Sequence, residues 1–254
     1  MNRVAVTGGG SNEYEQIGGG YAERRRADPR LARLIAEALG EAGSVVNVGA
    51  GTGSYEHAAR GTVAVEPAAV MIAQRAPAAA PCVRAFGEQL PFHDATFDAG
   101  LAVLTIHHWS DWRAGLRELV RVTRRRVVIS TWDPDCDGFW LVRDYMPVML
   151  ERDRRRFPGL GALREELGDI QVQPVLIPHD CTDGFLGAYW RRPAAYLDPT
   201  IRAGISSFAR PDLDAGLARL GADLADGAWA RKHGDLLERT EIDVGYRLVV
   251  AAHS

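Results

Sequence analysis

Apolar and polar positions follow each other along the chain in blocks that predict helices and strands in turn. Leu31, Leu34, Ile35, Ala38 and Leu39 share one helical face, and Gly40 follows them, so a helix is expected to end there. Short runs rich in β-branched residues then predict strands, with helical segments between them. The expected order is strand about 44–49, helix 54–60, strand 62–66, helix 67–75, strand 82–85, strand 98–104, helix 111–122, strand 126–131 and a last strand within 242–250. This alternation predicts a doubly wound α/β fold, with a mostly parallel sheet and helices on both faces.

The first predicted strand runs directly into closely spaced glycines. Gly49, Gly51 and Gly53 follow a run of valines, and such a loop lets the chain turn sharply and lets a ligand lie against bare backbone. The second predicted strand ends in Glu66. In doubly wound folds, an acid at this strand tip accepts hydrogen bonds from the ribose hydroxyls of a nucleoside. The two signals together predict a cofactor that contains a nucleoside.

The spacing of the glycines narrows the choice of cofactor. Dinucleotide-binding loops follow Gly-x-Gly-x-x-Gly, whereas the third glycine here comes one residue early. The loop has no basic residue, and Glu56 would place negative charge where a pyrophosphate would bind. These features disfavour an NAD-dependent oxidoreductase and favour an adenosine without pyrophosphate, for which S-adenosylmethionine (SAM) is a fitting ligand.

Two further motifs point to a family. Residues 87–99 read Gly-Glu-Gln-Leu-Pro-Phe-His-Asp-Ala-Thr-Phe-Asp-Ala, and residues 104–109 read Leu-Thr-Ile-His-His-Trp. With the glycine loop and the Val-Ala-Val-Glu-Pro segment at 63–67, they resemble class I SAM-dependent methyltransferases of the small-molecule group called type 11, in the family's order over residues 44–131. The resemblance implies a seven-stranded Rossmann-like sheet whose last strand is antiparallel, with a helical lid and cap insertions. It also implies a set of cofactor-binding residues: Tyr21, Gly49, Ala50, Gly51, Gly53, Glu66, Pro67, Met71, Gly87, Glu88 and Leu104. Phe86 departs from the pattern, since many relatives carry a small or acidic residue there.

Methyl transfer from SAM needs alignment and exclusion of water, and a base only if the acceptor must lose a proton early. His107 and His108 follow the fourth predicted strand, whose end opens on the ligand crevice, and His108 is the leading candidate for a base. The alternative is that His108 only bonds neighbouring loops. His179 and Asp180, which are expected to follow a sixth strand and to face the same crevice, form a second acid–base option. No histidine spacing typical of a metal site occurs, so no metal is expected.

The segments outside the core are expected to enclose the site. In similar methyltransferases the segment before the first core helix covers the cofactor. The resemblance therefore makes Tyr21 a candidate catalytic residue that covers the methyl end of SAM. An arginine of 24–26 is a candidate partner for the methionine carboxylate. Aromatic residues are candidates for an acceptor roof or for plain core packing: Trp132, Phe139, Trp140, Tyr145, Phe185, Tyr189, Trp190 and Tyr196. We expect one domain over 1–254, with a lid about 11–40, a core about 41–177 plus 241–254, and an acceptor cap about 178–240.

Composition fits this interpretation. The 254 residues are 46% hydrophobic and 25% charged, with a formal net charge of −3, so neither disorder nor a nucleic-acid partner is expected. The arginine runs 124–126 and 154–156 are expected at helix ends. No run of about 20 apolar residues and no apolar leader occurs, which predicts a cytoplasmic protein without membrane contact. The predicted function is methylation of an O, N or C atom of a small apolar or aromatic molecule. The sequence does not decide whether the chain forms a homodimer. The alternative is a non-catalytic SAM-binding partner protein of the same fold.

Overall fold

One seven-stranded sheet forms the centre of the computed structural model, which describes residues 25–56, 60–136, 138–209 and 211–252. Its strand order is β3-β2-β1-β4-β5-β9-β6. The five strands β3, β2, β1, β4 and β5 pair in parallel in this order, and β9 runs antiparallel to its neighbours β5 and β6. The strands are β1 (Ser44–Val48), β2 (Gly61–Val65), β3 (Cys82–Val83), β4 (Phe97–Val103), β5 (Thr123–Trp132), β6 (Ile170–Pro174) and β9 (Tyr246–Ala252). The predicted fold class, with its antiparallel last strand, is confirmed.

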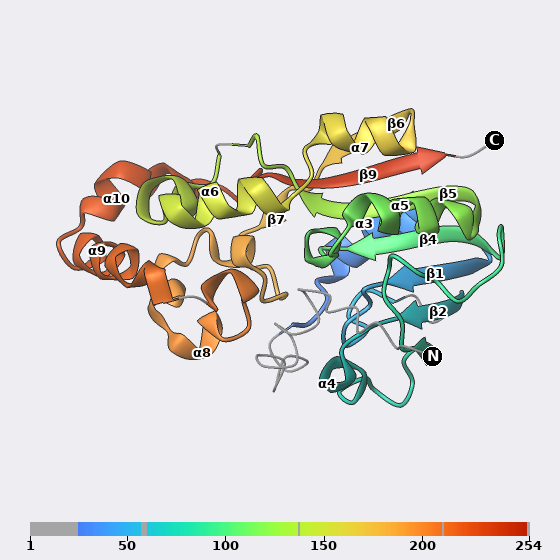
Figure 1. Cartoon of the computed structure of the whole chain (residues 1–254). Helices are drawn as coiled ribbons and strands as arrows, with labels where there is room; N and C mark the ends of the chain where they lie inside the picture. The colour runs from blue at the N-terminus through green and yellow to red at the C-terminus, as the bar shows by residue number, and fades with distance from the viewer. Residues whose placement is uncertain (1–24, 57–59, 137, 210, 253–254) are drawn as a thin grey trace.

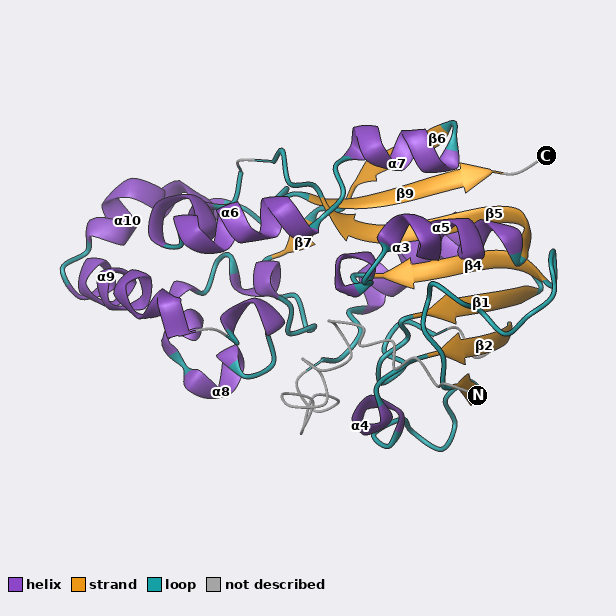
Figure 2. Ribbon diagram, in the orientation of Figure 1, coloured by secondary structure: helices purple, strands orange, loops and turns teal. Residues whose placement is uncertain are grey.

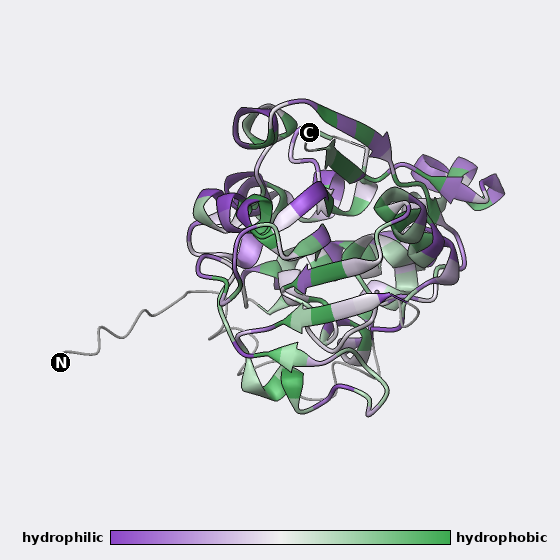
Figure 3. Cartoon of the chain, turned by 90° about the vertical axis from the view of Figure 1, so that its right-hand side faces the viewer, coloured by the Kyte–Doolittle hydropathy of each residue, from purple (hydrophilic) through white to green (hydrophobic). Residues whose placement is uncertain are grey.

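Helices cover both faces of this sheet (Figure 2). On one face, α3 (Pro29–Leu39) packs its apolar side against residues such as Val45 and Val128. On the other, α5 (Trp112–Arg121) and α7 (Leu160–Leu167) pack against Val46, Val127 and their neighbours. Adjacent strand residues therefore serve opposite cores, as the two-residue period of a strand requires. Figure 3 shows hydrophobic residues concentrated in the central strands.

A second group of helices lies beyond the ends of the strands. It contains α6 (Pro147–Arg156), α8 (Pro199–Arg202), α9 (Asp214–Ala225) and α10 (Ala228–His233), with a small sheet of β7 (Ile177–Pro178) and β8 (Glu241–Ile242) beside it. In Figure 1 the arrowheads of the parallel strands point toward this helical lobe. Ligand crevices of doubly wound sheets open at that edge, so the lobe stands over the expected site.

Several expected elements differ from those observed. In the predicted helix 54–60, residues 54–55 form a turn, residue 56 has no regular structure and residue 60 forms a bend, while 57–59 lie outside the described residues. The predicted helix 67–75 is reduced to α4 (Ala69–Ile72). The predicted strand 242–250 divides into β8 and β9, because Gly245 at φ +97° turns the chain between them. Arg124, Arg125 and Arg126 lie within β5, not at a helix end, since α5 already ends at Arg121.

No helix in the described ranges combines the length and apolarity that a membrane crossing needs. The longest is α9, with 12 residues, whereas a span requires roughly 20.

Candidate active site

A cleft opens at the carboxyl edge of the sheet, across the ends of β2, β1 and β4. It has about 980 Å³ of space, counting the solvent in its open mouth. The predicted residues that line it are Gly49, Ala50, Gly51, Glu66, Pro67, Met71, Gly87, Glu88, Leu104 and His108. The other lining residues, mostly missed from the sequence, are Arg25, Asn47, Thr52, Ser54, Tyr55, Phe86, Val103, Thr105, Trp109 and Ser110. Gly53 does not line the cleft, and Tyr21 lies outside the described residues.

The glycine loop has the backbone that its composition predicts. Gly49, Gly51 and Gly53 all have positive φ, at +70°, +53° and +91°. Packing adds a reason for glycine that the sequence did not show. A Cβ at Gly49 would lie 1.9 Å from the Thr105 hydroxyl oxygen, and one at Gly51 would lie 3.3 Å from the Met71 methyl carbon. Gly49 is thus required by its φ and by its contact with Thr105, whereas φ is the main constraint at Gly51, because the end of the Met71 side chain can shift slightly.

Glu66 anchors this loop to the second strand. Its side chain is buried, and its two oxygens accept hydrogen bonds from the backbone N–H of Gly51 at 2.8 Å and of Ala68 at 2.9 Å. These bonds fix the Glu66 carboxylate at the wall of the cleft.

Glu56 does not act as the sequence suggested. It forms a buried ion pair with Arg75, with N–O distances of 2.6 and 2.7 Å, and also accepts from the N–H of Ala80. Arg75 in turn donates to the carbonyl of Gly51 at 3.1 Å. Arg75, which follows α4 in the chain, therefore supports the glycine loop and neutralises Glu56. The sequence did not predict this pairing, because the two residues are far apart along the chain.

Asn47 presents an unsatisfied acceptor at the cleft. Its side chain is buried, and its Oδ1 has no hydrogen-bond partner among the described residues. A buried polar atom without a partner is costly, so this atom marks a place where a ligand donor is expected. The sequence signal was available, because Asn47 is the one polar side chain inside the apolar run 45–48.

The two histidines occupy different places. His107 stacks on Phe157, with ring centroids 3.8 Å apart, and does not line the cleft. His108 lines the cleft, and its Nδ1 lies 3.2 Å from the guanidinium of Arg156. Because arginine only donates, Nδ1 is the acceptor and the proton is on Nε2. Burial, with help from Arg156 and Arg25, lowers the pKa of His108 to about 3. Such a weak base is poorly suited to take a proton at neutral pH.

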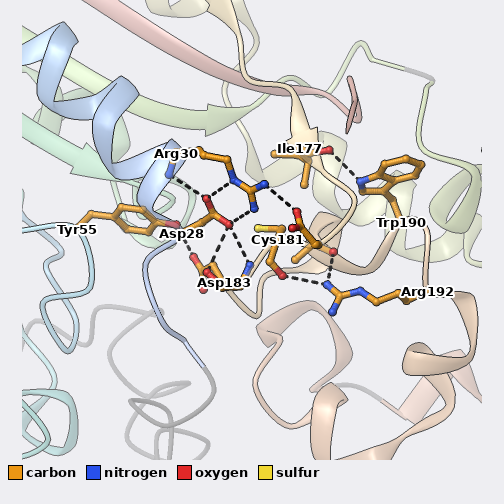
Figure 4. Close-up of polar contacts among 11 residues, drawn as sticks. Asp28, Arg30, Tyr55, Ile177, Cys181, Asp183, Trp190 and Arg192 are labelled. Carbon is orange, nitrogen blue, oxygen red and sulfur yellow. Dashed lines mark hydrogen bonds and ion pairs between the residues drawn. The ribbon is translucent and has the colours of Figure 1, made fainter. Parts of the chain in front are cut away.

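A buried carboxylate that the sequence analysis did not single out, Asp183, contacts two residues that line the cleft, and Figure 4 shows it beside one of them, Tyr55. Asp183 accepts hydrogen bonds from Tyr55 Oη at 2.7 Å and from Arg25 Nε at 2.6 Å. The predicted alternative, His179 with Asp180, is not among the residues that line the cleft, and Asp180 instead pairs with Arg30 on the surface. The nearby Asp28 also bonds Arg30 and Thr182, which joins the start of α3 to the loop carrying Asp183.

A second, mostly apolar cavity adjoins the cleft and has about 380 Å³ of space, counting its mouth. Tyr55, Val103 and Leu104 line both spaces. Leu104 has φ +49°, a conformation that is strained for a leucine. Strain of this kind often marks functional positions, and here it lies where the two spaces meet.

Most of the predicted roof aromatics are core residues. Trp140, Trp190 and Tyr196 are at most 1% exposed. Their polar atoms are satisfied internally: Trp140 donates to the carbonyl of Trp190, Trp190 to that of Ile177, and Tyr196 to that of Leu186. Of the eight candidates, only Phe185 lines a cavity described here. The aromatics of the lobe chiefly hold the lobe together.

No group of three or more potential metal ligands occurs among the described residues.

Comparisons with known proteins agree with this geometry. The sequence model of the family described as "Methyltransferase domain" matches residues 46–130. An Anabaena variabilis structure, named as a methyltransferase from an antibiotic biosynthesis pathway, is 35% identical, with a TM-score of 0.80 over 90% of this chain and 98% of that chain. A SAM-dependent methyltransferase of Thermotoga maritima has a TM-score of 0.57 at 15% identity, over 96% and 100% of the two chains. A Haemonchus contortus phosphoethanolamine N-methyltransferase, solved with S-adenosylhomocysteine (SAH), has a TM-score of 0.54 at 15% identity, over 98% and 58%. No curated protein matches the sequence.

Proposed function

The chain belongs to the family of SAM-dependent methyltransferases, and on that premise we propose that it methylates a small, apolar or aromatic acceptor. When bound, SAM supplies a methyl group already activated on a sulfonium. The protein then has to bind this donor, orient the acceptor and exclude water. The residues of the cleft suit these tasks.

We assign the nucleoside part of SAM to the side of the cleft formed by the end of β2. Glu66 is buried at the tip of β2, where Gly51 and Ala68 hold its carboxylate at the cleft wall. A carboxylate in this place suits the two ribose hydroxyls, because it can only accept hydrogen bonds and the hydroxyls can donate them. Met71 and Phe86, which line the same cleft, offer apolar surface for the adenine ring.

We assign the methionine part of SAM to the side of the cleft formed by the ends of β1 and β4. Asn47 Oδ1 lacks a partner among the described residues, and an ammonium group would supply the missing donor. Arg25 lines the same cleft and, as a bidentate donor, is suited to a carboxylate even though it also contacts Asp183. Under this assignment the methyl end lies toward β4, beside Leu104.

The low pKa of His108 bears on the chemistry. A group that stays neutral throughout the physiological range orients partners through Nε2–H and does not serve as a strong base. We therefore infer that positioning and water exclusion supply most of the rate enhancement.

The observation that carries the proposal is the buried Glu66 carboxylate at the wall of the cleft. Glu66→Ala is expected to weaken binding of SAM and SAH by about 1–3 kcal/mol, since ribose hydroxyls would lose their acceptor. Titration calorimetry measures this, with Glu37→Ala as control because Glu37 lies on the surface of α3. Unchanged affinity in the Glu66 variant, or tight binding of NAD in place of SAM, would contradict the proposal.

A further inference from the structure

Asp183 holds the guanidinium of Arg25 at two points. Its carboxylate accepts hydrogen bonds from Arg25 Nε at 2.6 Å and from Arg25 Nη2 at 3.2 Å. This is a bidentate contact along one edge of the guanidinium, and such contacts have a definite geometry. Because the guanidinium is planar and rigid, fixing one edge also fixes the directions of its other N–H groups. Arg25 therefore lines the cleft in an orientation that Asp183 sets.

Other protein groups hold both partners of this contact. The Asp183 side chain is 0% exposed, and it also accepts from Tyr55 Oη at 2.7 Å and from the backbone N–H of Gly184 at 2.7 Å. The backbone of Arg25 is held as well, since its carbonyl accepts from Ser54 Oγ at 3.1 Å. Groups that are fixed in this way by their surroundings are typical of a preorganised binding site.

A second acidic residue joins the same two segments. Asp28 accepts from the backbone N–H of Thr182 at 3.0 Å and from the Thr182 hydroxyl at 3.4 Å. Figure 4 shows Asp28, Asp183 and Tyr55 within one group of contacts. Each segment thus contributes an acid that binds the other segment. The place of Arg25 therefore depends on the loop after β7, in which Asp183 lies 158 positions further along the chain.

We propose that Asp183 is a positioning residue for the cofactor, which presents Arg25 in the orientation that receives the methionine carboxylate of SAM. The inference rests on the proposed function, which assigns that carboxylate to Arg25. It adds that a residue which is not among those lining the cleft helps to set cofactor affinity. Asp183 holds the guanidinium in place beforehand, so that cofactor binding does not have to immobilise a long side chain.

The negative charge of Asp183 acts in the opposite direction from its positioning effect. Like charges disfavour each other, so this carboxylate taken alone would repel a second carboxylate nearby. If positioning dominates, Asp183→Asn weakens the binding of a ligand that carries a carboxylate, and if repulsion dominates, it strengthens that binding. We expect positioning to dominate, because direct contact with Arg25 neutralises the charge of Asp183.

The test compares SAH with its decarboxylated analogue, which keeps the ammonium group and lacks the carboxylate. Calorimetry measures the affinity of both ligands for wild type, Asp183→Asn, Arg25→Met and the double variant. Asp180→Asn is the matched control. Asp180 lies on the same loop and also pairs with an arginine, but that partner is Arg30 and the Asp180 side chain is 59% exposed.

We expect Asp183→Asn to bind SAH about threefold to tenfold less tightly than wild type, which is the cost of immobilising one long side chain. Its affinity for the decarboxylated analogue should be unchanged, and Asp180→Asn should match wild type with both ligands. In the Arg25→Met background, Asp183→Asn should lower SAH affinity no further, because its effect passes through Arg25.

Hydrogen exchange of wild type, followed by NMR, keeps the test valid if a variant does not fold. The Arg25 Nε–H signal, assigned from its loss in Arg25→Lys, should be protected before SAH is added as well as after. Protection that begins only with SAH would overturn the inference, as would equal wild-type affinity for SAH and its analogue. It would also be overturned if folded Asp183→Asn bound SAH as tightly as wild type or more tightly, lost both ligands alike, or kept its full effect in the Arg25→Met background. Failure of wild type to bind SAH would instead refute the proposed function.

Discussion

The hydroxyl of Tyr55 donates a 2.7 Å hydrogen bond to the carboxylate of Asp183, which lies 128 positions further along the chain. The Asp183 side chain is fully buried and is also held by Arg25. The bond joins the glycine-loop region to the loop after β7, so one wall of the cleft depends on two distant segments. Burial and the negative charge of Asp183 raise the pKa of Tyr55, so the hydroxyl remains a donor at neutral pH.

Tyr55→Phe tests this link while keeping the ring. A hydrogen bond to a charged group contributes about 1.5–3 kcal/mol, so the free energy of unfolding is expected to fall by that amount in urea titrations. Tyr189→Phe is the control, because the structure shows no hydrogen bond to that hydroxyl within the described ranges, and its stability should hardly change. Equal stability of both variants would show that the Tyr55 bond contributes nothing.

Gly49→Ala tests the packing behind the glycine loop. The added Cβ would lie 1.9 Å from Thr105 Oγ1, and the positive φ adds strain. Gly168→Ala is the matched control: it also has positive φ, at +76°, but no atom lies within 4 Å of its added Cβ. Positive-φ strain costs about 1–3 kcal/mol in both variants. We expect Gly49→Ala alone to exceed this cost in urea unfolding and to lose SAH binding. The explanation fails if the two variants behave alike.

The pKa of His108 predicts how stability depends on pH. Its pKa is about 3 in the folded protein against an ordinary 6.5. Between these values the unfolded chain binds a proton that the folded chain does not, so stability is retained above pH 6.5 and lost as the pH falls toward 3. His108→Asn, which keeps an acceptor for Arg156, should reduce this loss, as acid titrations of unfolding will show. An NMR titration in which the His108 ring protonates near pH 6.5 would rule out this account.

Trp190→Ala is expected to act on stability. Trp190 is 0% exposed and donates to the carbonyl of Ile177, and truncating a buried tryptophan costs about 3–5 kcal/mol. Thermal unfolding should show a large loss, with a smaller one for Trp112→Ala, whose side chain is only partly buried. If Trp190→Ala keeps its stability and instead raises KM for an acceptor, the roof interpretation from the sequence is restored.

The fold and the glycine-loop side of the cleft were predictable because their signals are local. A glycine loop after a valine-rich strand, and an acid at the next strand tip, depend on backbone freedom and on side chains a few residues apart. Hence Gly49, Gly51 and Glu66 were identified from the sequence, and they line the cleft. The same periodicity predicted α3 and most strands of the sheet to within a few residues.

What the sequence by itself determined was therefore the doubly wound sheet and the loop at its edge. Only the tertiary structure decided which distant side chains meet there. Asp183 faces Tyr55 and Arg25, Arg75 neutralises Glu56, and Trp190 is turned into the core of the lobe. Arg75 lies 19 positions from Glu56, and Asp183 lies 128 and 158 positions from Tyr55 and Arg25. Such pairings depend on how the elements pack, and no period or spacing along the chain records them. The burial that lowers the pKa of His108 arises from the same packing, so its chemistry, unlike its position, could be known only from the folded molecule.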